Sequence, residues 1–263
     1  MNKLKIKGLN VIDYGGKGLP LVFIHAFPLC SRMWDGQVEY FKDKYRVIVY
    51  DIRGLGYSYD PDNLLFTMED LTDDLFGILD ELKLEKVIAC GLSLGGYILL
   101  RALVRNQERF LAAILADTKS EGESNESLLG RSAMIRNLKS GNKEVLDEFL
   151  KKLISKSSYE NETLRNFIRE MMSWMDVKGI CSVLFAIATR TNTFFQLKDI
   201  SVPALALTGK EDIITPPVHS FYMRENMQRT ELKVIKGSGH LSNMEVPEEF
   251  NKSVESFLKI NIK

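Results

Sequence analysis

The sequence has few cysteines, no net charge and no long apolar run. Its three cysteines, Cys30, Cys90 and Cys181, lie far apart and form no CxxC pair, so neither a disulfide framework nor a zinc site is indicated. Lysine and arginine total 35, as do aspartate and glutamate. This balance gives no electrostatic reason to expect nucleic acid or an anionic membrane as a partner.

No stretch approaches the roughly 18 apolar residues that a spanning helix needs. The first ten residues alternate charged and apolar side chains, unlike a signal peptide. A reducing, cytoplasmic setting is therefore expected. The 263 residues are 45% hydrophobic and 27% charged, which is normal for a globular protein with a full-sized core.

Short apolar runs alternate with segments of helical periodicity along the first half of the chain. Expected strands cover residues 4–7, 10–14, 21–24, 46–50, 87–90 and 112–116, and expected helices contain residues 34–41, 67–82 and 94–105. Continuous apolar runs such as 21–24 are typical of strands buried on both faces. The alternation predicts a mostly parallel sheet with helices on both faces, an α/β architecture.

The alternation stops for about 80 residues and then resumes. Strand patterns return only at 203–208 and 231–235, whereas the stretch between is mostly helical in period after a polar tract at 119–126. We therefore expect one core domain made of residues 1–117 and 199–263, interrupted by a helical cap at 118–198.

The strongest chemical signal is Gly91-Leu92-Ser93-Leu94-Gly95, a G-x-S-x-G motif. It directly follows one expected strand and directly precedes a helix, the context in which this motif carries a nucleophilic serine. The glycines permit a tight turn that raises the serine hydroxyl above the sheet edge. The backbone N–H of Leu94 then lies at a helix N-terminus, where it can face a developing oxyanion.

A serine hydroxyl needs a base to become a nucleophile. The chain has only three histidines. His25 ends an early strand and His219 falls in an expected helix after two prolines. His240 follows the last strand, at the sheet edge where open α/β folds bind ligands, and is therefore the predicted base.

A carboxylate must orient the imidazole. Asp212 follows a buried strand and gives the chain order Ser93, Asp212, His240, which is the order expected for this motif. Two alternatives stay open at this point: the adjacent Glu211, and Asp117 at the end of the strand before the insertion. For the second oxyanion donor, the loop after the first long buried strand predicts the backbone N–H of Phe27.

Together these motifs resemble the α/β-hydrolase superfamily. The likeness covers nearly the whole chain and rests on residues 25–28, 51–58, 91–95, 209–212 and 239–240. It implies the α/β-hydrolase fold and a Ser-His-Asp triad, with no metal or organic cofactor. Relatives with an aspartate nucleophile are disfavoured because position 93 is serine.

Within this superfamily the chain resembles small carboxylesterases and 3-oxoadipate enol-lactonase-like hydrolases, through residues 116–120 and 239–248. Two positions depart from the common pattern: His25-Ala26 replaces His-Gly, and Gly54-Leu55-Gly56 replaces Gly-His-Gly. The resemblance implies hydrolysis of a small carboxylic ester or lactone through an acyl-enzyme. Enol-lactonase activity, C–C bond hydrolysis, perhydrolysis and a triad-bearing ligand receptor remain alternatives.

The insertion carries a cluster of large apolar side chains, Met171, Met172, Trp174, Met175, Phe185, Phe194 and Phe195. Ordinary helix packing explains most of them, and an apolar lid over Ser93 is the functional alternative. No clear cationic cluster is visible. Arg190 is a candidate for binding a substrate carboxylate, although a solvated arginine is the simpler interpretation.

Overall fold

The computed structural model describes residues 1–262 and contains an eight-stranded sheet in the order β1-β2-β4-β3-β5-β6-β7-β8. The strands are β1 (Asn2–Ile6), β2 (Leu9–Asp13), β3 (Pro20–Ile24), β4 (Arg46–Tyr50), β5 (Val87–Leu92), β6 (Phe110–Ala116), β7 (Ala204–Gly209) and β8 (Thr230–Ile235). The pairs β1–β2 and β2–β4 are antiparallel, and all other neighbours are parallel. The predicted α/β-hydrolase architecture is confirmed.

The middle of the sheet is made of strands that are mainly apolar and almost completely buried. Every residue of β5 and of β7 is buried, and β3 and β6 are buried at all but one position. Strands that read as continuous apolar runs must have helices on both faces. β8, by contrast, is half-buried along most of its length, which suits its place at the edge.

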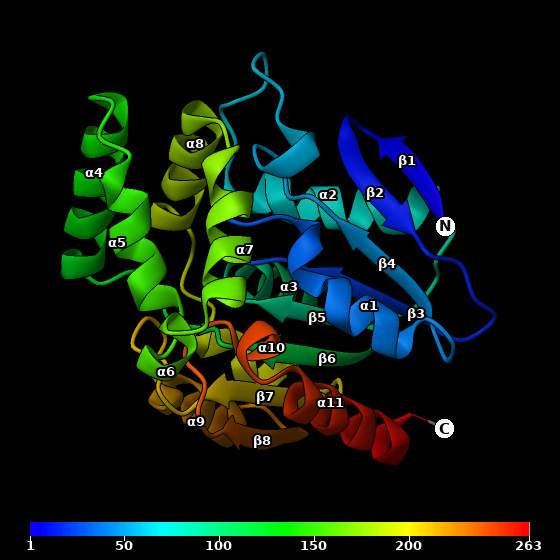
Figure 1. Cartoon of the computed structure of the whole chain (residues 1–263). Coiled ribbons are helices and arrows are strands. Elements are labelled where there is room, and N and C mark those ends of the chain that lie inside the picture. The colour runs from blue at the N-terminus through cyan, green and yellow to red at the C-terminus, as the bar shows by residue number, and fades with distance from the viewer. Residues whose placement is uncertain (263) are drawn as a thin grey trace.

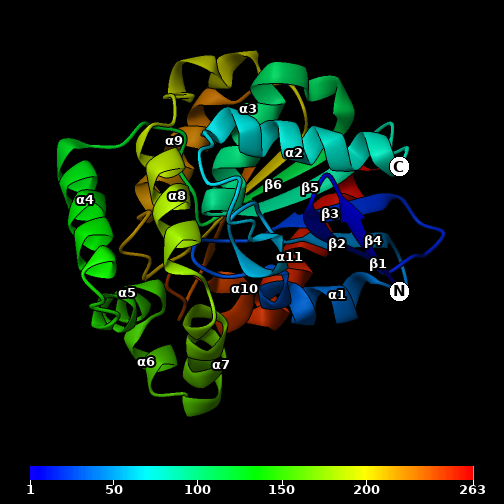
Figure 2. The same cartoon turned by 90° about the horizontal axis from the view of Figure 1, so that it is seen from above.

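Helices cover both faces of the sheet. They are α1 (Asp35–Phe41), α2 (Met68–Glu81), α3 (Leu94–Asn106), α9 (Pro217–Asn226), α10 (Ser242–Glu245) and α11 (Pro247–Asn261), with 3₁₀ turns η1 (Ser31–Trp34), η2 (Gly56–Ser58), η3 (Gln107–Arg109) and η4 (Phe194–Asp199). Figure 2 shows α2 and α3 on one face and α1 and α11 on the other. The expected helix at 34–41 therefore begins as a 3₁₀ turn.

The stretch between β6 and β7 is helical, as predicted. It contains α4 (Asn125–Lys139), α5 (Glu144–Leu153), α6 (Lys156–Tyr159), α7 (Glu162–Ser173) and α8 (Val177–Ala188). Figure 1 shows these helices beyond the arrowheads of β5, β6 and β7, at the carboxyl edge of the sheet. We call residues 118–198 the inserted segment; its status as a separate cap domain stays a prediction.

Within residues 1–262 no single helix has the length and apolar character needed to cross a membrane. One pair, Glu162–Ser173 with Val177–Ala188, meets those criteria only when joined across a 96° bend.

The turn from β5 into α3 is closely packed against the neighbouring backbone. A Cβ on Gly95 would lie 2.1 Å from the carbonyl oxygen of Ile24 in β3, and one on Gly91 would lie 2.2 Å from Gly95 O. Real side chains do not fit at such distances. Helix α3 therefore reaches the sheet closely only because both positions are glycine.

We expect Gly95→Ala to destabilise the protein by at least about 2 kcal/mol, because the added methyl group meets strand backbone that cannot move aside. Gly130→Ala is the matched control. Gly130 lies in α4, and within residues 1–262 no atom beyond the adjoining helix backbone lies within 4 Å of the position that a Cβ would take. The change to alanine should therefore raise the free energy of unfolding by about 0.5–1 kcal/mol. Urea unfolding at equilibrium measures both. Equal stability of Gly95→Ala and the wild type would contradict the packing argument.

Candidate active site

Ser93 occupies the turn between β5 and α3 in a left-handed backbone conformation, with φ 54° and ψ −110°. Non-glycine residues adopt positive φ rarely, and usually where surrounding structure enforces it. Here the Ser93 N–H donates to Ala116 O at 3.0 Å, and Thr118 Oγ1 donates to Ser93 O at 2.9 Å. Both partners belong to β6 or to the residues just after it, so the neighbouring strand fixes the serine.

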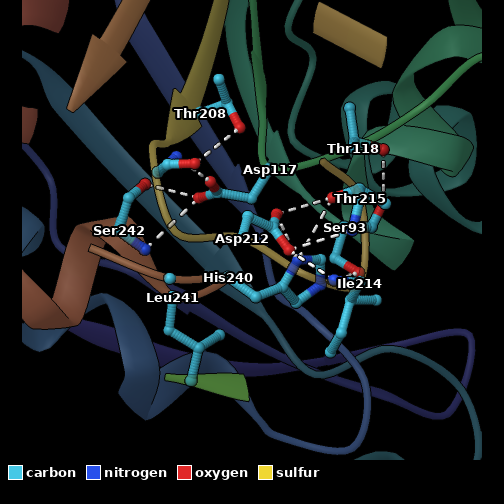
Figure 3. A network of polar contacts seen from close by, with 12 residues as sticks. Ser93, Asp117, Thr118, Thr208, Asp212, Ile214, Thr215, His240, Leu241 and Ser242 are labelled. Atoms are coloured by element: carbon cyan, nitrogen blue, oxygen red, sulfur yellow. Dashed lines mark hydrogen bonds and ion pairs between the residues drawn. The ribbon is translucent and has the colours of Figure 1, made fainter. Parts of the chain in front are cut away.

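The structure brings His240 and Ser93 together, as expected from the sequence. His240 Nε2 lies 2.8 Å from Ser93 Oγ, and the imidazole is fully buried. Figure 3 shows the imidazole between the serine and a carboxylate. The other two histidines are occupied elsewhere: His25 accepts from Ile52 N–H and pairs with its own neighbour Ala26 O, and His219 pairs with Glu121.

Asp212 lies on the other side of the imidazole. Its Oδ2 is 2.8 Å from His240 Nδ1 and also accepts a hydrogen bond from Thr215 Oγ1. Its Oδ1 accepts from the backbone N–H groups of Ile214 and Thr215. The carboxylate is thus held by four hydrogen bonds. Glu211, the adjacent alternative, is exposed to solvent.

Asp117, the other alternative, is buried close by but binds different groups. Its Oδ1 accepts from Gly209 N–H at 2.8 Å, and its Oδ2 is bonded to the hydroxyl of Ser242. Gly209 precedes the turn that carries Asp212, and Ser242 follows His240 by two residues. Asp117 therefore joins the two loops without a hydrogen bond to the imidazole (Figure 3).

Burial and mutual interaction set the pKa values of these groups. Burial alone would lower the pKa of His240, but the charge and hydrogen bond of Asp212 outweigh it, so the His240 pKa is raised above its ordinary value of 6.5. Burial would raise the pKa of Asp212, yet His240 and Thr215 hold it below the ordinary value. For Asp117, burial and the nearby Asp212 raise the pKa well above normal.

The loop of His240 is also attached to the inserted segment. The backbone N–H of His240 donates to Leu153 O at 3.1 Å, at the end of α5. Glu245 accepts from Gly239 N–H and Leu241 N–H through one oxygen and from Ser155 N–H through the other. His240, the predicted base, therefore has support from both the sheet edge and the inserted helices.

The predicted oxyanion donors lie beside the serine. Phe27 and Ser93 line the same cavity, and Leu94 is the first residue of α3. Within residues 1–262 no protein group accepts a hydrogen bond from the backbone N–H of Phe27 or Leu94. The preceding N–H, of Ala26, donates to the sulfur of Met33 instead.

A cavity of about 360 Å³ opens over Ser93 and His240, a volume near the lower limit for small-molecule sites. Its wall is mainly apolar and is supplied by Phe27, Tyr97, Met134, Val145, Phe149, Ile187 and Ile214. Arg131, Glu148 and Lys152 supply charged side chains. Sequence reasoning missed the residues from α4 and α5, although Val145 and Phe149 follow the i, i+4 spacing of one helix face.

Two interpretations of the inserted segment need correction. Arg190 is not solvated: its side chain is only 3% exposed, pairs with Glu123 and does not line the Ser93 cavity. Met171, Met172 and Met175 are buried, and none of them lines this cavity. Met175 also reaches η2, where its sulfur accepts a hydrogen bond from Gly56 N–H; these side chains are packing residues, as the ordinary explanation predicted. The expectation that the inserted segment has no clear cationic cluster was also wrong, because Lys119, Arg131 and Arg190 converge on Glu123.

The fold and the arrangement of Ser93, His240 and Asp212 at the sheet edge are typical of one protein family. Residues 20–247 match the family model described as the alpha/beta hydrolase fold, so the chain belongs to this family. The resemblance inferred from the motifs is confirmed.

Relatives of similar length include esterases and enol-lactonases. The chain is 29% identical over 255 residues to 3-oxoadipate enol-lactonase 1 of Acinetobacter baylyi, covering 96% of this chain and 94% of that one. Among solved structures, a thermophilic esterase from Thermogutta terrifontis aligns over 100% of both chains with TM-score 0.93 and 30% identity. The enol-lactonase of Burkholderia xenovorans LB400 aligns over 98% of this chain and 100% of its own, with TM-score 0.88 and 25% identity.

We expect a fluorophosphonate probe to label Ser93 alone, because no other hydroxyl in the described part of the chain, residues 1–262, is bonded to His240 Nε2. Peptide mapping by mass spectrometry identifies the modified residue. Ser93→Ala should abolish labelling, whereas Ser127→Ala should retain it, since Ser127 lines the same cavity but lacks a base. A tag on any other residue would refute the assignment.

Proposed function

We propose that this protein is a serine hydrolase that cleaves a small carboxylic ester or lactone, with Ser93 as nucleophile, His240 as base and Asp212 as orienting acid. One observation carries the proposal: a continuous chain of two 2.8 Å contacts, Ser93 Oγ to His240 Nε2 and His240 Nδ1 to Asp212 Oδ2, which ends in the cavity. Esterases and enol-lactonases among the relatives support this reaction class.

The proposed reaction has two stages. Ser93 Oγ attacks the carbonyl carbon as His240 Nε2 takes its proton, and the backbone N–H groups of Phe27 and Leu94 stabilise the oxyanion. His240 then gives the proton to the departing alkoxide, which leaves an acyl-enzyme. Water, deprotonated by His240, releases the acid and restores Ser93. Asp212 holds the imidazole in the tautomer that keeps Nε2 free to accept a proton.

We further propose that the inserted segment, residues 118–198, acts as a cap that shapes the acyl site. Met134 of α4, Val145 and Phe149 of α5 and Ile187 of α8 face the cavity of Ser93. Each buried methylene contributes about 0.8 kcal/mol until such a cavity is full, and overpacking costs more beyond that length. The volume therefore favours short acyl chains. A cytoplasmic location stays a prediction.

A second candidate function is hydrolysis of a carboxylated enol-lactone. Arg131 and Lys152 line the same cavity as Ser93, and cations in such a position favour a substrate carboxylate. Within residues 1–262, Arg131 forms a side-chain hydrogen bond through Nε alone, to Glu123 at 2.9 Å. Arg131 thus takes the role that the sequence suggested for Arg190. Two curated relatives are named 3-oxoadipate enol-lactonases.

A substrate panel distinguishes these functions. We expect p-nitrophenyl acetate and butyrate to have a higher kcat/KM than the decanoate or palmitate, because the cavity is small. Neutral lactones and the carboxylated enol-lactone complete the panel. Inert neutral esters with rapid enol-lactone turnover would replace the esterase assignment by the lactonase. Single turnover with a persistent adduct on all substrates would instead favour a ligand receptor.

We expect Asp212→Asn to keep the fold but lower kcat by about 10⁴-fold, because the amide no longer fixes the imidazole tautomer. The pH profile should change in a defined direction. His240 must be neutral to act as base, so the acidic limb of wild-type kcat/KM should lie above pH 6.5. Without the Asp212 carboxylate, the effect of burial lowers the pKa of His240. The acidic limb of the Asp212→Asn profile should therefore move to lower pH.

Asp117→Asn is the matched control, since it removes a buried carboxyl from the same sheet edge. The raised pKa of Asp117 favours the neutral carboxyl, and an amide is similar to a neutral carboxyl in shape and in charge. We expect activity within tenfold of the wild type and an unchanged pH limb. The reverse pattern in the two variants would transfer the orienting role to Asp117.

A further inference from the structure

The two ends of the inserted segment meet at one place beside helix α3. Thr193 donates to Ser120 O through its backbone N–H at 2.9 Å and through its hydroxyl at 2.8 Å. Arg190 donates from Nη2 to Glu121 O at 2.6 Å. Its guanidinium carbon lies 4.1 Å from the ring centre of Tyr97, a residue of α3. These contacts join the start and the end of the inserted segment to each other and to helix α3.

Positive charge is in excess at this junction. The carboxylate of Glu123 has a side-chain exposure of 1% and lies within 3.5 Å of Lys119, Arg131 and Arg190. The next carboxylate, Glu121, pairs with His219. Even when Glu121 is counted, three cations face two carboxylates.

The titration of these groups follows from that excess. Burial lowers the pKa of Lys119, and the charges of Arg190 and Arg131 lower it further, so that Glu123 only partly offsets the effect. Burial would raise the pKa of Glu123, but Arg131 and the other cations hold it below its ordinary value. Glu123 is therefore ionised, and its single negative charge is already included in the count of two carboxylates against three cations.

A small cavity lies within this junction. Its polar wall consists of Arg101, Lys119, Ser120, Arg190, Thr191 and Thr193. The cavity offers about 10 Å³ to the centre of a water-sized sphere, which is room for about one water molecule or one monoatomic ion of similar size. It is too small for a carboxylate or a phosphate group.

One guanidinium nitrogen of Arg190, a residue that lines this cavity, has no hydrogen-bond partner among residues 1–262. Arg190 Nη1 is fully buried and forms no hydrogen bond within residues 1–262. A buried donor left without an acceptor costs about 1–3 kcal/mol, and more when it is charged. Buried polar groups are nearly always satisfied, so this nitrogen indicates a ligand that accepts hydrogen bonds.

We propose that this cavity binds a chloride ion, held by Nη1 of Arg190 and by the ammonium group of Lys119. A chloride ion accepts several hydrogen bonds at once and cancels the excess positive charge, whereas a water molecule would leave the charge unbalanced. Tyr97 lines both this cavity and that of Ser93. The ion thereby stabilises the root of the inserted segment and the wall of the acyl site, whichever substrate the protein cleaves.

Thermal unfolding of the full chain in different sodium salts tests the proposal at constant ionic strength. Replacing gluconate by chloride or bromide should raise Tm in a saturable way, by about 2–4 °C for a protein of this size. Arg190→Met should abolish the difference between the salts. Arg105→Met removes an arginine from the surface of the same helix as Tyr97, and it should retain the difference.

A bromide-soaked crystal provides a second readout that does not depend on a variant. We expect an anomalous peak in contact with Arg190 Nη1. If Arg190→Met fails to fold, Lys119→Met removes the other proposed cationic ligand of the cavity and should weaken the halide effect. Equal Tm values in chloride and gluconate, a salt effect that persists in Arg190→Met, or a cavity without an anomalous peak would each overturn the proposal.

Discussion

The close approach of helix α3 to strand β3 is the constraint on which the candidate site depends. Two glycines allow this approach, because any Cβ at Gly91 or Gly95 would enter backbone atoms. The chain must then turn from β5 into α3 within one residue, and that residue, Ser93, takes a positive φ. The cost of this conformation is offset by hydrogen bonds from β6 and its following residues. A steric requirement of packing therefore determines where the hydroxyl stands.

Parallel strands convert separate sequence segments into one site. Ser93, Asp117 and Asp212 each follow a strand, β5, β6 and β7, that lies beside the next in the sheet, and His240 follows β8. Their side chains consequently converge at one edge despite wide separation along the chain. Asp117 adds a buried link between the loops of Asp212 and His240. The polar network is satisfied internally, which a buried site of this kind requires.

The parts that could be predicted from the sequence were those governed by local pattern. Continuous apolar runs identified β3, β5 and β6, and the glycine spacing around Ser93 identified the turn. His240 and Asp212 followed from their places after strands. The cavity wall could not be predicted, because residues such as Met134 and Phe149 reach it through the packing of helices onto one another. Arg190 was misjudged for the same reason: its burial depends on Glu123 and Tyr97, which lie far away in sequence.

The hydrogen bond from His240 N–H to Leu153 O has a mechanical consequence. Glu245 reinforces it by joining Ser155 to the residues on either side of His240. A rigid-body movement of the whole inserted segment would therefore displace the backbone of His240 and separate its imidazole from Ser93. An opening of the cavity that leaves His240 in place would instead involve α4 and the first turns of α5, while the end of α5 stays attached to the His240 loop. The inserted segment, which lines the cavity of Ser93, therefore also supports the loop of His240.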